Sequence, residues 1–295
     1  MRVLLSALVV LIGSAQAFQK PSLTPSAARQ VMSMTAATEP TSIPFSQPDR
    51  VIREKLPTVY VYDHCPFCVR VRFALGLKNI KHNVHFMAND DVPTPTALVG
   101  KKIAPIFQWE EADVCMAESL DIIDLVDQDP RMGPTGVILP ATDRSDIKAW
   151  QKSVRDLLRV LQRPRYVETG LLPEFQQYDA RRMFIMNHQM PPYEKADWKA
   201  NVPEEERMAI YAEAMAKDPA DDIEVLNRKL VELDDIIYSE DHCSPGGLSY
   251  DDIDLFARLR SITIIKGVVW PAKLRAYMDK MSKLGDVPLY DAMAM

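Results

Sequence analysis

The chain has 295 residues, of which 47% are hydrophobic, and this content is sufficient for two domains of ordinary size with packed cores. Its formal net charge of -6 argues against a nucleic-acid partner, because binding to phosphates requires a basic surface. Beyond the N-terminus no apolar run is long enough to cross a bilayer, so we expect no membrane helix in the mature protein.

The first part of the chain, residues 1–50, has the composition of a targeting segment. Residues 3–12 form an apolar stretch after a basic start, and Ala-Gln-Ala at residues 15–17 is typical of a signal-peptide cleavage site. Residues 18–42 are rich in Ser, Thr and Ala, as in an organelle transit peptide. This two-part arrangement is similar to the plastid signals of algae whose plastids are reached through the secretory route. A secreted protein with a propeptide is the alternative, and in either case we exclude this segment from the fold.

Residues 57–128 carry alternating strand and helix patterns. β-branched and aromatic residues predict four strands, at residues 58–62, 82–87, 105–109 and 114–116. Helical spacing of apolar residues, with Pro66 in the first turn, predicts a helix that reaches about residue 80. A short helix within NDDVPTPTALVG and another at residues 118–126 complete a β-α-β-α-β-β-α order. This order is that of a thioredoxin-like domain.

The remainder of the chain is predicted to be a linker followed by an all-helical domain. Residues 129–143, DPRMGPTGVILPATD, contain the Pro and Gly residues typical of a linker. Residues 144–295 show helical patterns, at residues 147–161, 205–216, 222–238, 250–265 and from 271 onward. The predicted fold class is therefore α/β followed by all-α.

A capping box marks the start of one helix in this second domain. Ser249 is placed as its N-cap, Asp252 follows three residues later, and Leu248 is positioned to contact Ile253. The helix that follows is apolar on most sides up to about Ile265. We therefore expect it to be central and buried.

The four cysteines indicate redox chemistry more than metal binding or structural crosslinking. A zinc site would need a second pair, whereas Cys115 and Cys243 stand alone, and a core of this size needs no disulfide scaffold. Cys65 lies at a strand-to-helix junction, where free N–H groups and the helix dipole stabilise a thiolate. Cys68 lies one turn later and can form a disulfide with it. We expect an exposed attacking Cys65, a buried resolving Cys68, a buried Cys115 and a surface thiol at Cys243.

Further residues near this pair could define the partner thiol. Pro105 follows a loop and begins a strand. Thioredoxin-like folds carry a cis proline at this position, and it presents the backbone of the preceding residue, here Ala104, to an extended thiol peptide. A trans proline at a strand edge is the alternative. Glu118 and Ser119 begin a helix and could hold the carboxylate and ammonium groups of a γ-glutamyl moiety, or act only as a helix cap. His64 either helps to hold the thiolate or is solvated.

Sequence motifs along the chain resemble the large two-domain bacterial type-two glutaredoxins. The resemblance covers residues 57–295, and its motifs are YDHCPFC, GLKNI, NDD, TPT, VGKK, API, ESLDI, DDIDLFARLRSIT, WPAKL and LYDAMAM. It implies a thioredoxin-like domain followed by a helical domain like that of glutathione transferases. It also implies that Cys65 is the nucleophile and Cys68 the resolving thiol. Lys102 is a candidate for the glycine carboxylate of glutathione. The implied glutathione contacts are Phe67, Ala104, Pro105, Glu118 and Ser119.

The resemblance further implies a glutathione-dependent thiol-disulfide oxidoreductase. Its substrates would be protein–glutathione mixed disulfides, with glutathione as cosubstrate, no metal and a monomeric chain. A glutathione transferase-like conjugating enzyme is one alternative, which the second cysteine disfavours. An iron–sulfur cluster carrier, with two chains sharing a cluster through Cys65, is another, which Pro66 disfavours. A membrane-tethered prostaglandin-synthase-like protein is a more remote one.

Overall fold

The strands of the described residues form one four-stranded sheet. The computed structural model describes residues 55–295, and the predicted targeting segment lies outside them. The sheet order is β2-β1-β3-β4, with β1 parallel to β2 and antiparallel to β3, and β3 antiparallel to β4. All four predicted strands are present, within a single residue of the expected bounds: β1 Thr58–Val61, β2 Asn83–Phe86, β3 Ile106–Trp109 and β4 Val114–Ala117.

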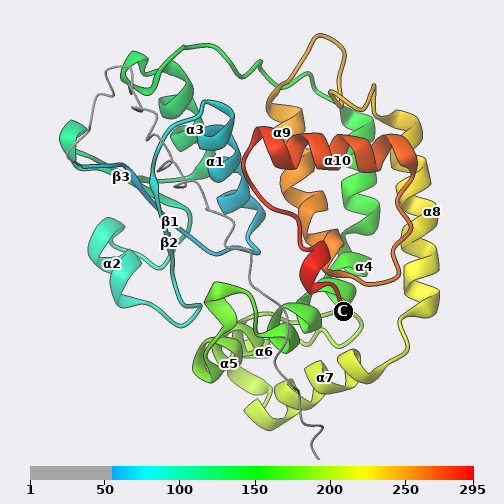
Figure 1. Ribbon diagram of the computed structural model, residues 1–295. Coiled ribbons are helices and arrows are strands. Elements are labelled where there is room, and N and C mark those ends of the chain that lie inside the picture. Colours follow the sequence, from blue (N-terminus) through cyan, green and yellow to red (C-terminus); the bar gives the residue numbers. More distant parts are fainter. Residues whose placement is uncertain (1–54) are drawn as a thin grey trace, which may run out of the picture. The chain divides into compact units, whose positions relative to one another are not determined.

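The helices of the first half confirm the thioredoxin-like order. They are α1 (Pro66–Leu77), α2 (Pro93–Val99) and α3 (Ser119–Gln128), and the 3-10 turn η1 (Glu110–Ala112) joins β3 to β4. Helix α2 contacts β3 and β4, whereas α1 packs against α3. Side chains from Cys68 to Leu75 are all buried, because α1 also packs against α9 (Tyr250–Leu259) and α10 (Ala272–Leu284), as Figure 1 shows.

The second half, residues 129–295, contains helices and no strand longer than an isolated bridge. This confirms the predicted fold class, whereas the division of residues 52–295 at a linker stays a prediction. Helix α4 packs against α7 and α8, and α5 packs against α7. The remaining elements are η2 (Pro130–Met132), α4 (Ser145–Thr169), η3 (Pro173–Phe175), α5 (Tyr178–Asn187), α6 (Trp198–Asn201), α7 (Glu204–Ala216), α8 (Ala220–Ile236), η4 (Arg260–Ile264) and η5 (Asp291–Met293).

Three helices differ from the sequence expectations. Helix α4 was expected to end near residue 161, but it continues through Pro164 to Thr169. A proline removes one backbone hydrogen bond inside a helix, and here the side chains of residues 164–167 are all buried, which offsets that loss. Helices α5 and α6 were not predicted at all.

The predicted central helix is confirmed, and its capping box is formed. The Ser249 side chain accepts the Asp251 N–H, and the Asp252 carboxylate accepts the Ser249 N–H at 2.9 Å. Helix α9 ends at Leu259, and the chain then continues as the 3-10 turn η4, whose residues are all buried. The N-terminal cap and the buried surface together fix this helix beside α1.

Close backbone contact joins α1 to the turn after α10. A Cβ atom on Gly76 would lie 1.9 Å from the carbonyl oxygen of Gly285. A Cβ atom on Gly285 would lie 2.3 Å from the ring of Phe73. Because no side chain fits at these distances, both glycines are required for α1 to approach the C-terminal helix.

Candidate active site

Cys65 is the N-cap residue of α1, and its environment stabilises a thiolate. Its backbone is extended, with φ -74° and ψ 119°, and its thiol is half-buried. A hydrogen bond from the Cys68 thiol, the electrostatic effect of the nearby His64 and the N–H groups of Cys68 and Phe67 outweigh burial and lower the pKa of Cys65 to about 6. At neutral pH this sulfur is therefore mainly an anion.

Cys68 lies one helical turn further into α1 and is fully buried. Burial and the neighbouring Cys65 sulfur raise the pKa of the Cys68 thiol well above its ordinary value. The backbone N–H of Tyr62 donates to the Cys68 sulfur at 3.4 Å. A half-buried anionic sulfur beside a buried protonated thiol is the arrangement expected of an attacking and a resolving cysteine.

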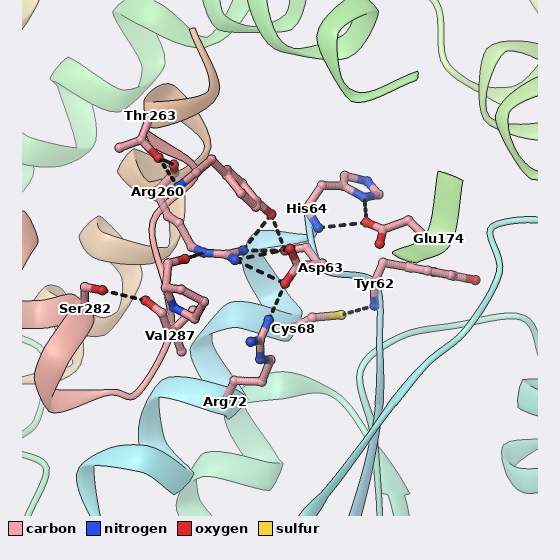
Figure 2. A network of polar contacts seen from close by, with 12 residues as sticks. Tyr62, Asp63, His64, Cys68, Arg72, Glu174, Arg260, Thr263, Ser282 and Val287 are labelled. Carbon is pink, nitrogen blue, oxygen red and sulfur yellow. Dashed lines mark hydrogen bonds and ion pairs between the residues drawn. The ribbon is translucent and has the colours of Figure 1, made fainter. Parts of the chain in front are cut away.

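His64 is held by a carboxylate from the helical half of the chain (Figure 2). Glu174 accepts the His64 backbone N–H at 2.8 Å, and the same oxygen lies 2.6 Å from the ring Nδ1. The ring centroid lies 5.1 Å from those of Tyr166 and Phe175 and 5.3 Å from that of Phe184. His64 is therefore a packed and hydrogen-bonded residue, and the expectation of a solvated histidine is wrong.

Asp63 is clamped by residues from the C-terminal part of the chain, as Figure 2 shows. Nη1 of Arg260 donates to the Asp63 backbone carbonyl at 2.7 Å, and Nη2 lies 3.1 and 3.2 Å from the two carboxylate oxygens. Arg72 donates to the same carboxylate, and the Tyr290 hydroxyl donates to the Asp63 carbonyl at 2.9 Å. Burial alone would raise the pKa of Asp63, but Arg260 and Arg72 hold it below its ordinary value. The loop before Cys65 is thus fixed on both sides.

The sheet register brings the other predicted site residues to the same end of the sheet as the N-terminus of α1. Ile106 pairs with Tyr60 of β1 on one side and with Ala117 of β4 on the other. Pro105 directly precedes Ile106, and Glu118 directly follows Ala117. Both residues therefore lie beside the end of β1. The Ala104–Pro105 peptide bond is cis, which is the geometry expected in a thioredoxin-like fold.

These predicted glutathione contacts differ in exposure. Glu118 is exposed, with Lys101 Nζ at 3.7 Å, and its φ of 74° lies in a region that residues with a Cβ seldom adopt. Ser119 is buried at the start of α3, and the Phe67 ring is 48% exposed. Lys102 donates to the backbone carbonyl of Asn89 at 2.5 Å, so its predicted role with a glycine carboxylate stays a prediction.

A cavity of about 650 Å³ opens beside Cys65 on the side of the helical half. Residues of α4, α5 and α9 line it together with the segment from His64 to Phe67. None of Ala104, Pro105, Glu118 and Ser119 belongs to its lining. The cavity beside Cys65 is therefore separate from the predicted glutathione contacts at the end of the sheet.

Comparisons with known proteins agree with this geometry. The family model described as glutaredoxin 2, C-terminal domain, matches residues 146–294, and that of the glutathione S-transferase N-terminal domain matches residues 59–134. Glutaredoxin 2 of Escherichia coli strain K12 is 33% identical over 238 residues, which are 80% of this chain and 99% of that protein. The chain belongs to the glutaredoxin 2 family.

Solved structures support the same assignment. The glutaredoxin 2 of Salmonella typhimurium, crystallised in complex with glutathione, has a TM-score of 0.65 and 31% identity, covering 81% of this chain and 99% of that one. The glutathione transferase GSTFuA3 of Phanerochaete chrysosporium, at a TM-score of 0.53 and 13% identity over 78% of this chain and 97% of that one, shares the fold. This glutaredoxin 2 family member therefore has the architecture that the sequence resemblance implied.

The two remaining cysteines of this glutaredoxin lie opposite to expectation. Cys115 is exposed, because β4 is an edge strand of the sheet. Cys243 is fully buried, because its loop packs against the N-terminus of α9, where the Asp252 carboxylate accepts its N–H at 2.6 Å. Burial raises the pKa of the Cys243 thiol, which makes it unreactive.

Within residues 55–295 of this glutaredoxin, no group of three His, Cys, Asp or Glu side chains is placed to hold a metal ion. No helix in the same part of the chain is both long and apolar enough to span a bilayer. The functional residues that the sequence missed are Glu174 and Arg260, which contact the active-site loop from 110 and 197 residues away. No local pattern marks Glu174, whereas Arg260 lies within the motif DDIDLFARLRSIT, which does not by itself indicate a contact with the active-site loop.

Proposed function

We propose that this protein reduces protein–glutathione mixed disulfides, with Cys65 as the nucleophile and glutathione as the cosubstrate. The observation that carries the proposal is the half-buried Cys65 at the N-terminus of α1, beside the buried Cys68 thiol. Membership of the glutaredoxin 2 family supports thiol-disulfide chemistry. The glutathione in the crystal structure of the Salmonella relative supports the choice of cosubstrate.

The reaction is two successive disulfide exchanges. The Cys65 thiolate attacks the glutathione sulfur of the mixed disulfide, so that a Cys65–glutathione disulfide forms and the protein leaves as a thiolate. A glutathione thiolate then attacks the glutathione sulfur on Cys65, which yields oxidised glutathione and regenerates the Cys65 thiolate. When Cys68 attacks Cys65 first, an internal disulfide forms, and two glutathiones are needed to reduce it.

Four residues at the end of the sheet, together with Phe67 of α1, are proposed to hold glutathione during these steps. Ala104 and Pro105 directly precede β3, where the backbone of Ala104 would pair with an extended peptide. The start of α3 offers backbone N–H groups to a carboxylate at Ser119, and the exposed Glu118 offers its own carboxylate to an ammonium group. Phe67 would cover the sulfur from the other side.

Serine substitutions test the assignment of the two cysteines. We expect Cys65→Ser to abolish reduction of a glutathionylated protein, because an alcohol is not a nucleophile toward disulfides. We expect Cys68→Ser to retain most of this activity, because glutathione itself can clear Cys65. Cys115→Ser is the matched control, since this thiol is exposed on β4, outside the lining of the cavity beside Cys65. Activity that survives Cys65→Ser would refute the proposal.

The compartment and the assembly state are part of the same proposal. Residues 1–50 are proposed to direct the protein to a plastid, where a reducing interior suits glutathione-dependent chemistry. Fusion of this segment to a fluorescent protein tests the address, and secretion of the fusion would contradict it. We further propose a monomer, to be measured by light scattering on the purified chain.

A further inference from the structure

The cavity between Cys65 and the helices combines apolar walls with a cationic lining. Its apolar side chains are Trp150, Val154, Leu158, Tyr166, Phe184, Ala257 and Leu259. Its cationic side chains are Arg155, Arg159, Arg163 and Arg258. No aspartate or glutamate lines it among the described residues. Such a lining fits a ligand that is partly apolar and carries a negative charge.

Two polar side chains of the lining have unmet bonding capacity. Nη1 of Arg163 donates to the backbone carbonyl of Gln189, and within residues 55–295 this guanidinium forms no hydrogen bond to a carboxylate. Burial lowers the pKa of the Arg163 guanidinium. Nε2 of Gln162 is buried and has no hydrogen-bond partner in the described part of the chain. Both groups are hydrogen-bond donors, which is the chemistry that an anion in the cavity requires.

The acids around the cavity compensate only part of this charge. Arg159 lies 2.5 Å from Glu194 and 3.4 Å from Asp156, which also contacts Arg155. Arg258 pairs with Asp254, which is shared with Arg70 of α1. His188 also lines the cavity, and burial lowers its pKa to about 4, so at neutral pH it adds no charge. Four arginines of the lining, together with Arg70 outside it, therefore exceed the three carboxylates and the Cys65 thiolate by one positive charge.

We infer that this cavity binds a small aromatic or similarly apolar organic acid, as the thiol half of a mixed disulfide with glutathione. A cavity of about 650 Å³ accommodates a molecule of this size, and it opens next to Cys65. The inference rests on the proposed function and adds a substrate class to it. Glutathione would lie at the end of the sheet, while the acid lies among the helices with its charge at Arg163.

This arrangement places the scissile bond at Cys65. The Cys65 thiolate attacks the glutathione sulfur, the disulfide bond to the organic acid breaks, and the acid leaves the cavity as a thiolate that takes a proton from water. A glutathione thiolate then displaces Cys65 from its mixed disulfide and forms oxidised glutathione. Glutathione supplies both electrons, so no other reductant is required.

The test compares two isosteric substrates that differ in one charge. They are the mixed disulfides of glutathione with 4-(mercaptomethyl)benzoic acid and with 4-(mercaptomethyl)benzamide. We expect kcat/KM of the full chain to be about tenfold higher for the acid, mainly through KM, because a charge-assisted hydrogen bond is worth about that factor. In Arg163→Gln this ratio is expected to fall to about one. Equal KM values for the two substrates in the unmodified protein would overturn the inference.

Matched variants separate local charge from folding and from general electrostatics. Arg228 is 60% exposed on α8, outside the cavity lining, and Arg228→Gln is expected to keep the tenfold ratio. Arg155 is 68% exposed and can be replaced without loss of packing, so Arg155→Gln serves if Arg163→Gln fails to fold. We expect Arg155→Gln to lower the ratio about twofold. A ratio that all three variants leave unchanged would also overturn the inference.

A further measurement distinguishes failure of the cavity from failure of the proposed function. The mixed disulfide of glutathione with 2-mercaptoethanol lacks the organic acid and therefore tests only the redox step. If the protein does not reduce this disulfide, the proposed function is refuted, whatever the cavity binds. Calorimetric titration with 4-methylbenzoate and with 4-methylbenzamide then tests the cavity directly. Binding of the benzoate that is lost in Arg163→Gln supports the inference, and equal affinity for the two compounds overturns it.

Discussion

Replacement of Cys68 by alanine tests the main source of the acidity of Cys65. The hydrogen bond from the Cys68 thiol is the largest of the effects that lower the pKa of Cys65 to about 6. Cys68→Ala removes this donor, so we expect the pKa of Cys65 to rise. Cys68→Ser retains an O–H donor at the same position and is expected to leave the pKa closer to that of the unmodified protein.

The expected magnitude follows from the thiolate fraction. At pH 6 a pKa of about 6 leaves about half of Cys65 as thiolate, against about 0.3% for a free cysteine with a pKa of about 8.5. A less basic thiolate is also a weaker nucleophile, by about tenfold for this difference in pKa. The net advantage of Cys65 is therefore about tenfold at pH 6 and only a few-fold at pH 7. Above about pH 7.5 a free cysteine reacts faster.

The assay is the rate of alkylation by iodoacetamide between pH 4 and pH 10, with the site assigned by mass spectrometry. Cys115→Ser is the suitable background, because Cys115 is also exposed. We expect the Cys65 rate to rise with pH around a midpoint near 6 and to reach a plateau above it. A midpoint near 8.5, or one that Cys68→Ala does not move, would refute the account of a stabilised thiolate.

Three further predictions concern the surroundings of Cys65. Glu174→Gln removes the carboxylate that holds the ring of His64 beside Cys65. Because the electrostatic effect of His64 lowers the pKa of Cys65, we expect the alkylation midpoint of Cys65 to move to higher pH. Arg260→Ala leaves Asp63 buried with one cationic partner fewer, and we expect it to lower the free energy of unfolding in urea by about 3–5 kcal/mol. Gly76→Ala places a methyl group against a backbone oxygen after α10, and we expect it to lower the melting temperature, at a cost of about 1–3 kcal/mol.

Matched controls define the outcomes that contradict these three predictions. Arg228→Ala removes an exposed arginine of α8 and is expected to change the free energy of unfolding by less than about 1 kcal/mol. If Arg260→Ala lowers the free energy of unfolding by no more than Arg228→Ala does, the buried ion pair does not stabilise the loop. Gly100→Ala has open space for its Cβ but a φ of 78°, so it isolates backbone strain from the contact made at Gly76. For Glu174→Gln, an unchanged midpoint would show that this carboxylate does not act on Cys65.

Local sequence patterns determined most secondary structure and the chemical pair at its centre. Alternating β-branched residues predict the four strands, and the helical spacing of apolar residues after Pro66 predicts α1. Both patterns can be recognised because each follows a periodicity of the backbone itself. The position of Cys65 at a strand-to-helix junction similarly specifies a helix N-terminus and its partial positive charge. The order of these elements was enough to predict the fold class.

Tertiary packing decided what those patterns do not contain. The exposure of Cys115 depends on β4 being an edge strand, and the burial of Cys243 depends on a loop covered by α9. Glu174 and Arg260 reach the active-site loop across 110 and 197 residues, and the arginine-lined cavity exists only where α4, α5 and α9 meet. Contacts between distant segments are set by how buried surfaces fit together, and this fit leaves no periodic trace along the chain.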